Sequence, residues 1–193
     1  MPQDENKDCY CNRSKKIISQ GDIIRELNLV LSSKIDNIGD FSLASSFSYG
    51  VVLSQECDLV QHYDCIEKNL MIEESKKSDD KIIETLLICP AFPLEKFLIG
   101  DHIEGKRMNP WGTTEKVMKK IRDNDELPRF HHIPALKDRL PELVIDFKRF
   151  YTVPLGIFDN DFNKFYITSI KDLYRERLSQ RFTNYLGRIG LPN

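Results

Sequence analysis

The sequence lacks any hydrophobic stretch able to cross a membrane, because none of its apolar runs approaches the ~18 residues that a spanning helix requires. It also lacks a secretory signal, since residues 1–14 are polar and of mixed charge. An excess of one sign of charge is also lacking, because 28 Lys and Arg residues are balanced by 30 Asp and Glu residues, for a formal net charge of −2. These absences predict a cytoplasmic protein with no membrane partner, and they argue against a uniformly basic nucleic-acid binder.

Phosphate-binding loops and metal-ligand spacings are missing as well. No GxGxxG or GxxxxGK[ST] pattern occurs, which argues against nucleotide hydrolysis through such loops. The five cysteines are an odd number, and Cys9-Tyr-Cys11 is too closely spaced for a zinc knuckle. Cys57, His62 and Cys65 could hold a metal only within a tight loop, and buried or idle thiols are the ordinary alternative. The sequence therefore predicts reduced thiols, no metal and no cofactor.

Enough apolar residues are present for a packed core, at 40% of 193 residues. Residues 1–14 predict a disordered polar tail, and residues 15–193 predict a single domain. Short apolar runs bounded by Gly and Pro indicate strands with few helices between them, which is typical of a β-rich α+β domain. The expected strands lie in Ile17–Ile24 (with a turn at Gly21-Asp22), Tyr49–Ser54, Lys81–Cys89, Leu143–Phe147, Phe150–Phe158 and Phe165–Thr168.

One long helix is expected over residues 169–187, packed on the sheet. Ser169-Ile-Lys-Asp172 has the form of a capping box with Asp in place of Glu. A shorter helix, capped by Thr113 or Thr114, is expected to end at Arg122. The proline-rich segment from residue 123 to 141 is expected to be largely irregular. The apolar stripe of the long helix consists of Ile170, Leu173, Tyr174, Leu178, Phe182, Tyr185 and Leu186.

Two of the expected strands carry a family resemblance. Gly21-Asp22-Ile23-Ile24 is followed by Val51-Val52-Leu53-Ser54, and this pairing resembles the start of PemK/MazF-type proteins. Leu86–Pro90 is similar to the central strand of that family, and Leu143–Pro154 to a later strand pair. The resemblance covers roughly residues 20–160. It implies a small SH3-like barrel that cleaves RNA as a toxin.

The chain departs from the family pattern at the catalytic arginine. In the toxins an Arg-Pro pair normally precedes the apolar strand, and its Arg serves the active site, whereas Tyr49-Gly50 stands there in this chain. The insert between the two matching strands and the terminal helix are also atypical. These departures favour a catalytically silent module that keeps the barrel and binds a protein partner.

Cys57 and Asp58 follow a predicted buried strand, where polar side chains are commonly presented to a cleft. Cys57 could act as a nucleophile if His131 or His132 activated its thiol, with Asp58 orienting the imidazole. The ordinary alternative is that Asp58 caps the following turn while Cys57 packs as a small hydrophobic residue.

Arg129-Phe-His131-His132 contains the residue types for RNA cleavage without a metal. His131 would be the general acid or base, and Arg129 would stabilise the charged phosphorane. A surface loop with two adjacent histidines explains the same residues. In an extended segment only one of the two histidines can face a site.

Asp146-Phe-Lys148 is similar to the D-x-K half of a metal-dependent nuclease. In that hypothesis two carboxylates bind magnesium and the lysine orients the attacking water. A polar residue on the exposed face of a strand is the ordinary explanation. The second carboxylate would have to come from Asp123, Asp125, Asp138 or Glu142.

The expected terminal helix is basic, with five basic and two acidic residues between Lys171 and Asn193. Lys171, Arg175 and Arg181 flank its apolar stripe, and with the nearby tyrosines they predict a surface that follows a phosphate backbone and stacks bases. A solvated helix surface with local ion pairs is the alternative.

Together these patterns favour a nucleic-acid-acting protein of bacterial toxin or defence character, with RNA or DNA as its partner. The leading activity is that of a metal-independent ribonuclease whose site consists of Cys57, Asp58, Arg129 and His131. Two alternatives stay open, namely the silent module with a protein partner and the metal-dependent nuclease. No oligomeric state follows from the sequence.

Overall fold

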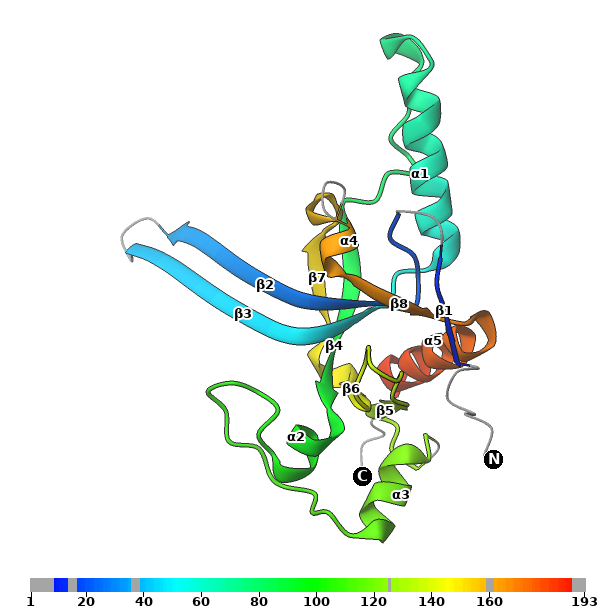
Figure 1. The fold of residues 1–193 in the computed structure, drawn as a ribbon. Coiled ribbons are helices and arrows are strands. Elements are labelled where there is room, and N and C mark those ends of the chain that lie inside the picture. The colour runs from blue at the N-terminus through cyan, green and yellow to red at the C-terminus, as the bar shows by residue number, and fades with distance from the viewer. Residues whose placement is uncertain (1–8, 14–16, 36–38, 125, 159–161, 189–193) are drawn as a thin grey trace.

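The computed structural model describes residues 9–13, 17–35, 39–124, 126–158 and 162–188, with the side chains of 27–46 and Ser75 outside that description. One antiparallel sheet forms the body, in the order β1-β8-β2-β3-β4-β6-β5, with β7 also pairing with β4. The sheet curls into an open half-barrel (Figure 1). Its strands are β1 (Tyr10–Cys11), β2 (Asp22–Ile35), β3 (Gly39–Val52), β4 (Thr85–Pro93), β5 (Phe130–Ile133), β6 (Leu143–Asp146), β7 (Tyr151–Pro154) and β8 (Tyr166–Ile170).

Five α-helices and three short 3₁₀ turns are described around the sheet. The longest two are α1 and α5, and α5 packs Leu178 and Phe182 into the largest cluster of buried apolar side chains. This confirms a β-rich α+β fold with a packed carboxy-terminal helix. The helices are α1 (Glu56–Leu70), α2 (Leu94–Ile99), α3 (Glu115–Arg122), α4 (Phe162–Phe165) and α5 (Asp172–Leu186), and the turns are η2 (Glu74–Lys76), η3 (Phe147–Arg149) and η4 (Leu155–Ile157).

Gly21 lies immediately before β2 and permits the Arg175 side chain to pack closely beside it. Gly21 has a φ of +80°, a left-handed conformation that favours glycine. Its N–H donates to the Val52 carbonyl (2.9 Å), and the Arg175 side chain lies 3.1 Å from where a Cβ would stand. The chain then enters β2, where Ile23 pairs with Val51 of β3. The two expected strand segments are therefore neighbours in the sheet.

Strands β2 and β3 continue beyond the sheet as a two-stranded ribbon (Figure 1). β2 pairs with β8 only over Asp22–Ile24, and β3 pairs with β4 only over Tyr49–Val52. The expected strand Tyr49–Ser54 is thus the inner end of a longer strand. The stretch from residue 32 to 48 is rich in Ser and Asn, so its local turn propensity predicts a loop where the structure has the outer part of this ribbon.

Strand β4 contains Pro90, which the sequence suggests as a strand end. β4 pairs with β7 through Thr85–Ile88 and with β6 through Ala91–Pro93. Pro90 lies between these two pairings, so the missing N–H interrupts neither ladder. The expected strands at 143–147 and 150–158 consequently do not pair with each other, because both pair with β4.

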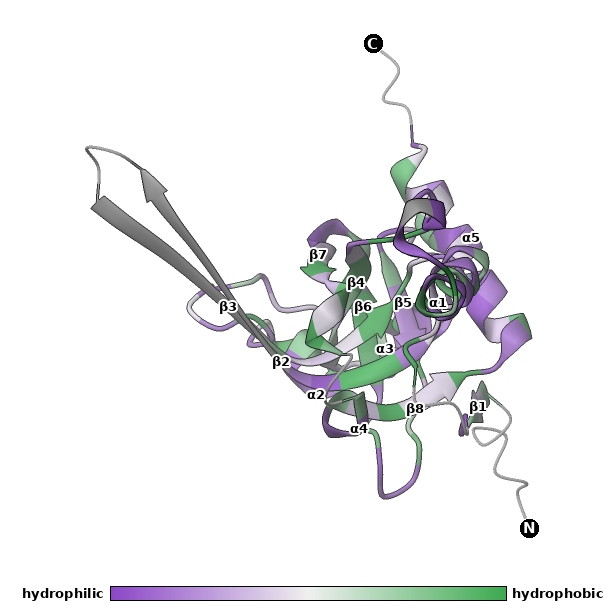
Figure 2. Cartoon of the chain, turned by 90° about the horizontal axis from the view of Figure 1, so that it is seen from above, coloured by the Kyte–Doolittle hydropathy of each residue, from purple (hydrophilic) through white to green (hydrophobic). Residues whose placement is uncertain are grey.

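The core is divided among three clusters. One lies between the sheet and α5, a second between the sheet and α1 and α4, and a third beneath α2 and α3. Figure 2 shows hydrophobic residues concentrated in the central strands β4 and β6, with hydrophilic residues on the outer turns of α5. The Thr114 hydroxyl accepts a hydrogen bond from the Val117 N–H, so the expected cap of α3 is confirmed.

Boundaries near both ends of the chain also differ from the sequence-based expectations. Within the expected tail 1–14, Tyr10–Cys11 form β1 on β8, and the Tyr10 ring is 6% exposed. The partner strand lies about 160 residues away, so local sequence cannot reveal the pairing. The terminal helix begins at Asp172 instead of 169, because Ser169 pairs in β8 and its hydroxyl donates to Asp22.

The sequence-based expectations also omit α1 and β5. The segment 56–70 forms α1, which projects from the body (Figure 1). Residues 130–133, within the segment expected to be irregular, form β5, and all four are buried. Pro128 and Pro134 bracket β5 without entering it, so the strand forms between them. Over the described residues, no helix is long and apolar enough to cross a membrane.

Candidate functional site

The predicted site residues fall into two separate groups. Cys57 and Asp58 lie in the first turn of α1, whereas Arg129 and His131 lie at the start of β5. Figure 1 places β5 beside α3 and away from α1. The basic residues of α5 divide in the same way, since its first turn lies near α1 and Arg181 lies near β5.

The first group carries no histidine. Cys57 is exposed, and its thiol lies 3.5 Å from the Gln55 amide oxygen and 3.6 Å from the Asp58 carboxylate. Gln55, not Asp58, is the residue at the amino end of α1, and its side chain makes no capping bond. The structure therefore does not bring Cys57 and Asp58 together with His131, as a cysteine nucleophile with a His base would need.

The first turn of α5 is held by acidic side chains. Arg175 is 13% exposed, with its Nη1 3.7 Å from a Glu56 oxygen and its Nη2 3.1 Å from Asp172. The Glu56 carboxylate also accepts from Arg13 (2.9 Å). Lys171 precedes α5, and its N–H donates to the Cys9 carbonyl. At this end of α5, the predicted phosphate-binding residue Arg175 is neutralised by carboxylates.

His131 is enclosed by apolar and cationic neighbours. It is 7% exposed and its ring lies 6.2 Å from that of Phe147. Burial, and next the charge of Arg181, lower the pKa of His131 to about 3. Its Nδ1 has no hydrogen-bond partner among the described residues. The imidazole is therefore neutral at neutral pH, which does not suit a general acid.

His132 is buried too, on the other face of β5, where it contacts Glu142 (Nε2 to Oε1, 3.2 Å). Glu142 also binds Arg122 through two hydrogen bonds of 2.8 and 2.9 Å. The Glu142 side chain is thus engaged away from Asp146, the acid of the D-x-K hypothesis. Among the described residues, no group of three His, Cys, Asp or Glu side chains gathers as metal ligands.

Asp146 instead lies in a clamp of two arginines. Its side chain is fully buried, and both oxygens accept from Arg129, at 2.7 Å from Nε and 2.6 Å from Nη2. The Nε of Arg149 lies 3.3 Å from Asp146 Oδ2. The Lys148 N–H donates to Oδ1 (3.1 Å) and fixes the start of η3. With both oxygens engaged, Asp146 is placed to hold arginines.

Cationic and aromatic side chains surround this clamp. Phe150 is 42% exposed and packs edge-on against Phe182 at 5.7 Å. The Arg188 guanidinium lies 4.2 Å above the Tyr185 ring, and that ring lies 5.9 Å from Phe147 of η3. We call the surface formed by these groups the Arg129 surface. Its members are Arg129, Lys148, Arg149, Phe150, Tyr185 and Arg188.

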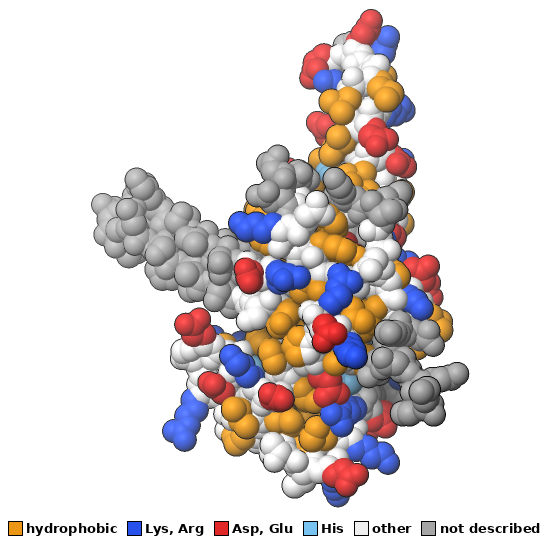
Figure 3. All heavy atoms as spheres, viewed as in Figure 1, with side chains coloured by type: hydrophobic (Ala, Val, Ile, Leu, Met, Phe, Trp, Pro, Cys, Tyr) orange, Lys and Arg blue, Asp and Glu red, His pale blue; other side chains and the backbone are white. Residues whose placement is uncertain are grey.

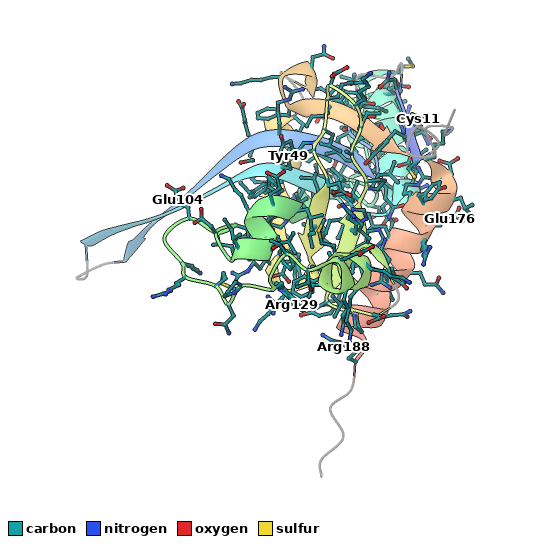
Figure 4. All side chains as sticks on the ribbon, turned by 60° about the horizontal axis from the view of Figure 1, so that its bottom comes forward. Cys11, Tyr49, Glu104, Arg129, Glu176 and Arg188 are labelled. Carbon is teal, nitrogen blue, oxygen red and sulfur yellow. The ribbon has the colours of Figure 1, made fainter. Side chains whose placement is uncertain are left out.

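The two ends of α5 present different chemistry. Figure 4 labels Arg129 and Arg188 on the face turned forward, with Glu176 and Cys11 away from them. Arg181 supports the backbone next to the Arg129 surface. Its Nη2 donates hydrogen bonds to the Leu127 and Phe130 carbonyls (3.0 Å each) at the start of β5. Of the three predicted α5 cations, Arg181 is thus close to the surface, while its guanidinium is turned to the backbone.

A second buried carboxylate belongs to Asp22, the first residue of β2. Asp22 accepts from the Ser169 hydroxyl (2.6 Å) and the Ser19 N–H (2.8 Å), and Ser169 contacts the Tyr166 hydroxyl (2.9 Å). Burial raises the pKa of Asp22 to about 6, against the lowering effect of these hydrogen bonds. From the sequence, Gly21-Asp22 predicts only a turn before β2. The buried role of Asp22 is not visible there, because its partner Ser169 lies far away in the sequence.

A cleft of about 250 Å³ lies between α1 and the segment that follows it. Its walls carry both charges, including Asp64, Lys68 and Lys81, and the partly exposed Cys65. None of the predicted site residues lines it. The Cys65 thiol lies 3.1 Å from the Ser78 carbonyl, which is a local contact that ties the segment to α1.

Comparison with known proteins gives no further assignment. No protein-family model, curated protein or solved structure gives a significant match to this chain.

Proposed function

We propose that this protein binds nucleic acid through the Arg129 surface. The carrying observation is that Arg129 and Arg149 face one buried carboxylate, with the exposed Lys148 and Phe150 on either side of Arg149 in the chain and Arg188 over the Tyr185 ring. Guanidinium and ammonium groups supply the phosphate contacts that dominate nucleic-acid affinity. Exposed aromatic rings next to them offer faces on which bases stack.

The sequence resemblance adds a fold and a substrate class to this proposal. We infer that the curled sheet is a variant of the PemK/MazF barrel, supported by the pairing of Ile23 with Val51 and by the turn at Gly21-Asp22. That relationship favours RNA as the ligand and a toxin or defence role. Cleavage by His131 is not part of the proposal, because burial lowers its pKa to about 3 and leaves the imidazole neutral.

A charge reversal tests the proposal. Lys148 is exposed and lies two residues after Asp146, so Lys148→Glu places a negative charge on the Arg129 surface without removing a buried contact. We expect fluorescence anisotropy with labelled RNA and DNA oligonucleotides to show at least tenfold weaker binding. The control Lys81→Glu makes the same charge change beyond α1. Equal effects of both variants, or no binding by the wild type, would contradict the proposal.

A second candidate function is the protein-binding module, which the distal half of α1 favours. Leu70 and Met71 are 80% and 85% exposed, and Ile66 is 37% exposed on the same projecting helix. Figure 3 shows hydrophobic side chains among charged ones along this projection. Affinity purification from the source cells separates the candidates, since only the module predicts a protein that Leu70→Asp loses and Lys148→Glu retains.

A further inference from the structure

Two arginines of the Arg129 surface lie against the buried carboxylate of Asp146. Asp146 is fully buried and takes two hydrogen bonds from Arg129, of 2.7 and 2.6 Å, in the fork geometry that a carboxylate and a guanidinium share. Arg149 approaches the same oxygen, Oδ2, at 3.3 Å. The Arg129 guanidinium also lies 4.8 Å from the centre of the Phe130 ring. Neither arginine is a freely moving surface side chain.

Each guanidinium keeps donors that the described residues do not use. Arg129 spends Nε and Nη2 on Asp146, and no protein oxygen among the described residues accepts from its Nη1. The Arg149 Nε lies 3.3 Å from Asp146 Oδ2 without a hydrogen bond to it, and its Nη2 donates to the Met108 sulfur, 3.9 Å away, which is a weak acceptor. Their side chains are 32% and 22% exposed, so solvent and a ligand can reach them.

The charge of this arrangement calls for an anion. Two guanidiniums face one carboxylate, which leaves one net positive charge, and the neighbouring Lys148 adds another. Fixed guanidinium donors match the oxygens of a phosphate, and less ordering entropy is lost on binding than with a flexible lysine. A carboxylate that holds Arg129 and attracts Arg149 from the protein side leaves their outer edges ready for such oxygens.

We propose that Arg129 and Arg149 form a two-guanidinium anchor for one backbone phosphate of the nucleic acid, with Asp146 as the positioning residue that fixes the Arg129 fork and attracts the Arg149 guanidinium to the same place. The inference rests on the proposed function, since it names the part of the Arg129 surface that holds the ligand most rigidly. Lys148 and Arg188 then add positive charge around the anchor. The anchor requires the shape of arginine, whereas the surrounding cations require charge alone.

Charge-conserving variants separate these two requirements. Arg129→Lys and Arg149→Lys retain the formal charge and lose the fork, so we expect each to weaken binding of a labelled oligonucleotide about tenfold at fixed salt. The matched control Lys148→Arg also keeps the charge, and we expect its affinity to stay within twofold of the wild type. Asp146→Asn keeps an acceptor for the Lys148 N–H while removing the charge, and we expect it to weaken binding similarly.

Pyrophosphate provides a probe that contains no base or sugar. We expect it to compete with the oligonucleotide for the wild type and to compete at least fivefold less well for Arg149→Lys. Thermal melts of every variant establish that the protein remains folded, and the Arg→Lys arms keep the test intact should Asp146→Asn unfold. Circular dichroism of the unliganded variants provides the same check at the assay temperature.

The failures of the two proposals are distinguishable. Unchanged affinity in both Arg→Lys variants, together with a loss in Lys148→Glu, would overturn the anchor and leave nucleic-acid binding by the surface in place. No binding by the wild type would overturn both. A loss in Lys148→Arg equal to that in Arg149→Lys would also contradict the anchor, because it would show a general sensitivity of η3 to substitution.

Discussion

Asp22 is the residue whose environment most directly couples stability to pH. Burial raises its pKa from 3.8 to about 6, so the folded chain holds the proton more tightly than the unfolded chain. Between about pH 4 and pH 6 the folded state binds more protons, and stability falls as pH rises. Above this window the wild type carries the full cost of a buried ionised carboxylate.

Asp22→Asn removes that dependence, because the amide cannot ionise. We expect the unfolding free energy of the variant relative to the wild type to rise by about 2 kcal/mol between pH 4 and pH 7. Urea unfolding at several pH values measures this difference. Asp64→Asn, on the exposed face of α1, is the matched control and should show no comparable trend. A pH-independent difference for Asp22→Asn would contradict the assignment.

Gly50 is needed for close packing within the sheet. A Cβ at this position would lie 2.8 Å from the Phe47 ring and 2.9 Å from Ile88 Cγ2, shorter than atoms tolerate. We expect Gly50→Ala to destabilise the protein by about 1–3 kcal/mol, because these buried side chains must move. Denaturant titration gives the value. Ser48→Ala, on the exposed side of the same strand, should change stability by less than about 0.5 kcal/mol.

The residue types in the sequence indicate which side chains can carry a function, but they do not show which side chains contact one another. Arg129 and Asp146 are both visible in the sequence, as parts of two different hypotheses, and the structure joins them in one ion pair. Their 17-residue separation and the antiparallel pairing of β5 with β6 produce that contact. His131 shows the opposite outcome, since β5 buries it and its expected catalytic role loses solvent access.

At the scale of elements, α1 has an anchored inner half and a projecting outer half. Leu59 is 1% exposed, whereas Leu70, three turns later, is 80% exposed. We expect Leu59→Ala to cost about 2–5 kcal/mol of stability and Leu70→Ala less than about 0.5 kcal/mol. Urea unfolding of the two variants provides the comparison. Equal losses would show that the outer half packs on the body in solution.

Local patterns predict some elements and miss others for physical reasons. The cap of α3 follows from spacing within one helix. Of the expected apolar stripe of α5, Leu178 and Phe182 are buried, whereas the prediction is wrong for Leu173, Tyr174 and Leu186, which are exposed. β1 is missed because its two residues are stabilised by a partner strand distant in sequence. The ribbon β2–β3 is missed because Ser and Asn favour turns locally, while strand pairing overrides that preference.

At the scale of the whole molecule, a net charge of −2 conceals an uneven distribution. The carboxylates Glu56 and Asp172 neutralise the first turn of α5, whereas Arg188 at its far end lies over an aromatic ring. Figure 3 shows both charges intermixed on the face in view. A nucleic acid would therefore be held at a local surface, and affinity would depend on a few cations.

Salt dependence of binding tests this central claim most directly. The slope of log K against log salt counts phosphate contacts at about 0.7–0.9 per contact. We predict that Lys148→Ala/Arg188→Ala lowers the steepness of the slope by about 1.5, whereas Lys68→Ala/Lys81→Ala, with the same net charge, leaves it unchanged. Equal slopes for the wild type and both double variants would contradict nucleic-acid binding through the Arg129 surface.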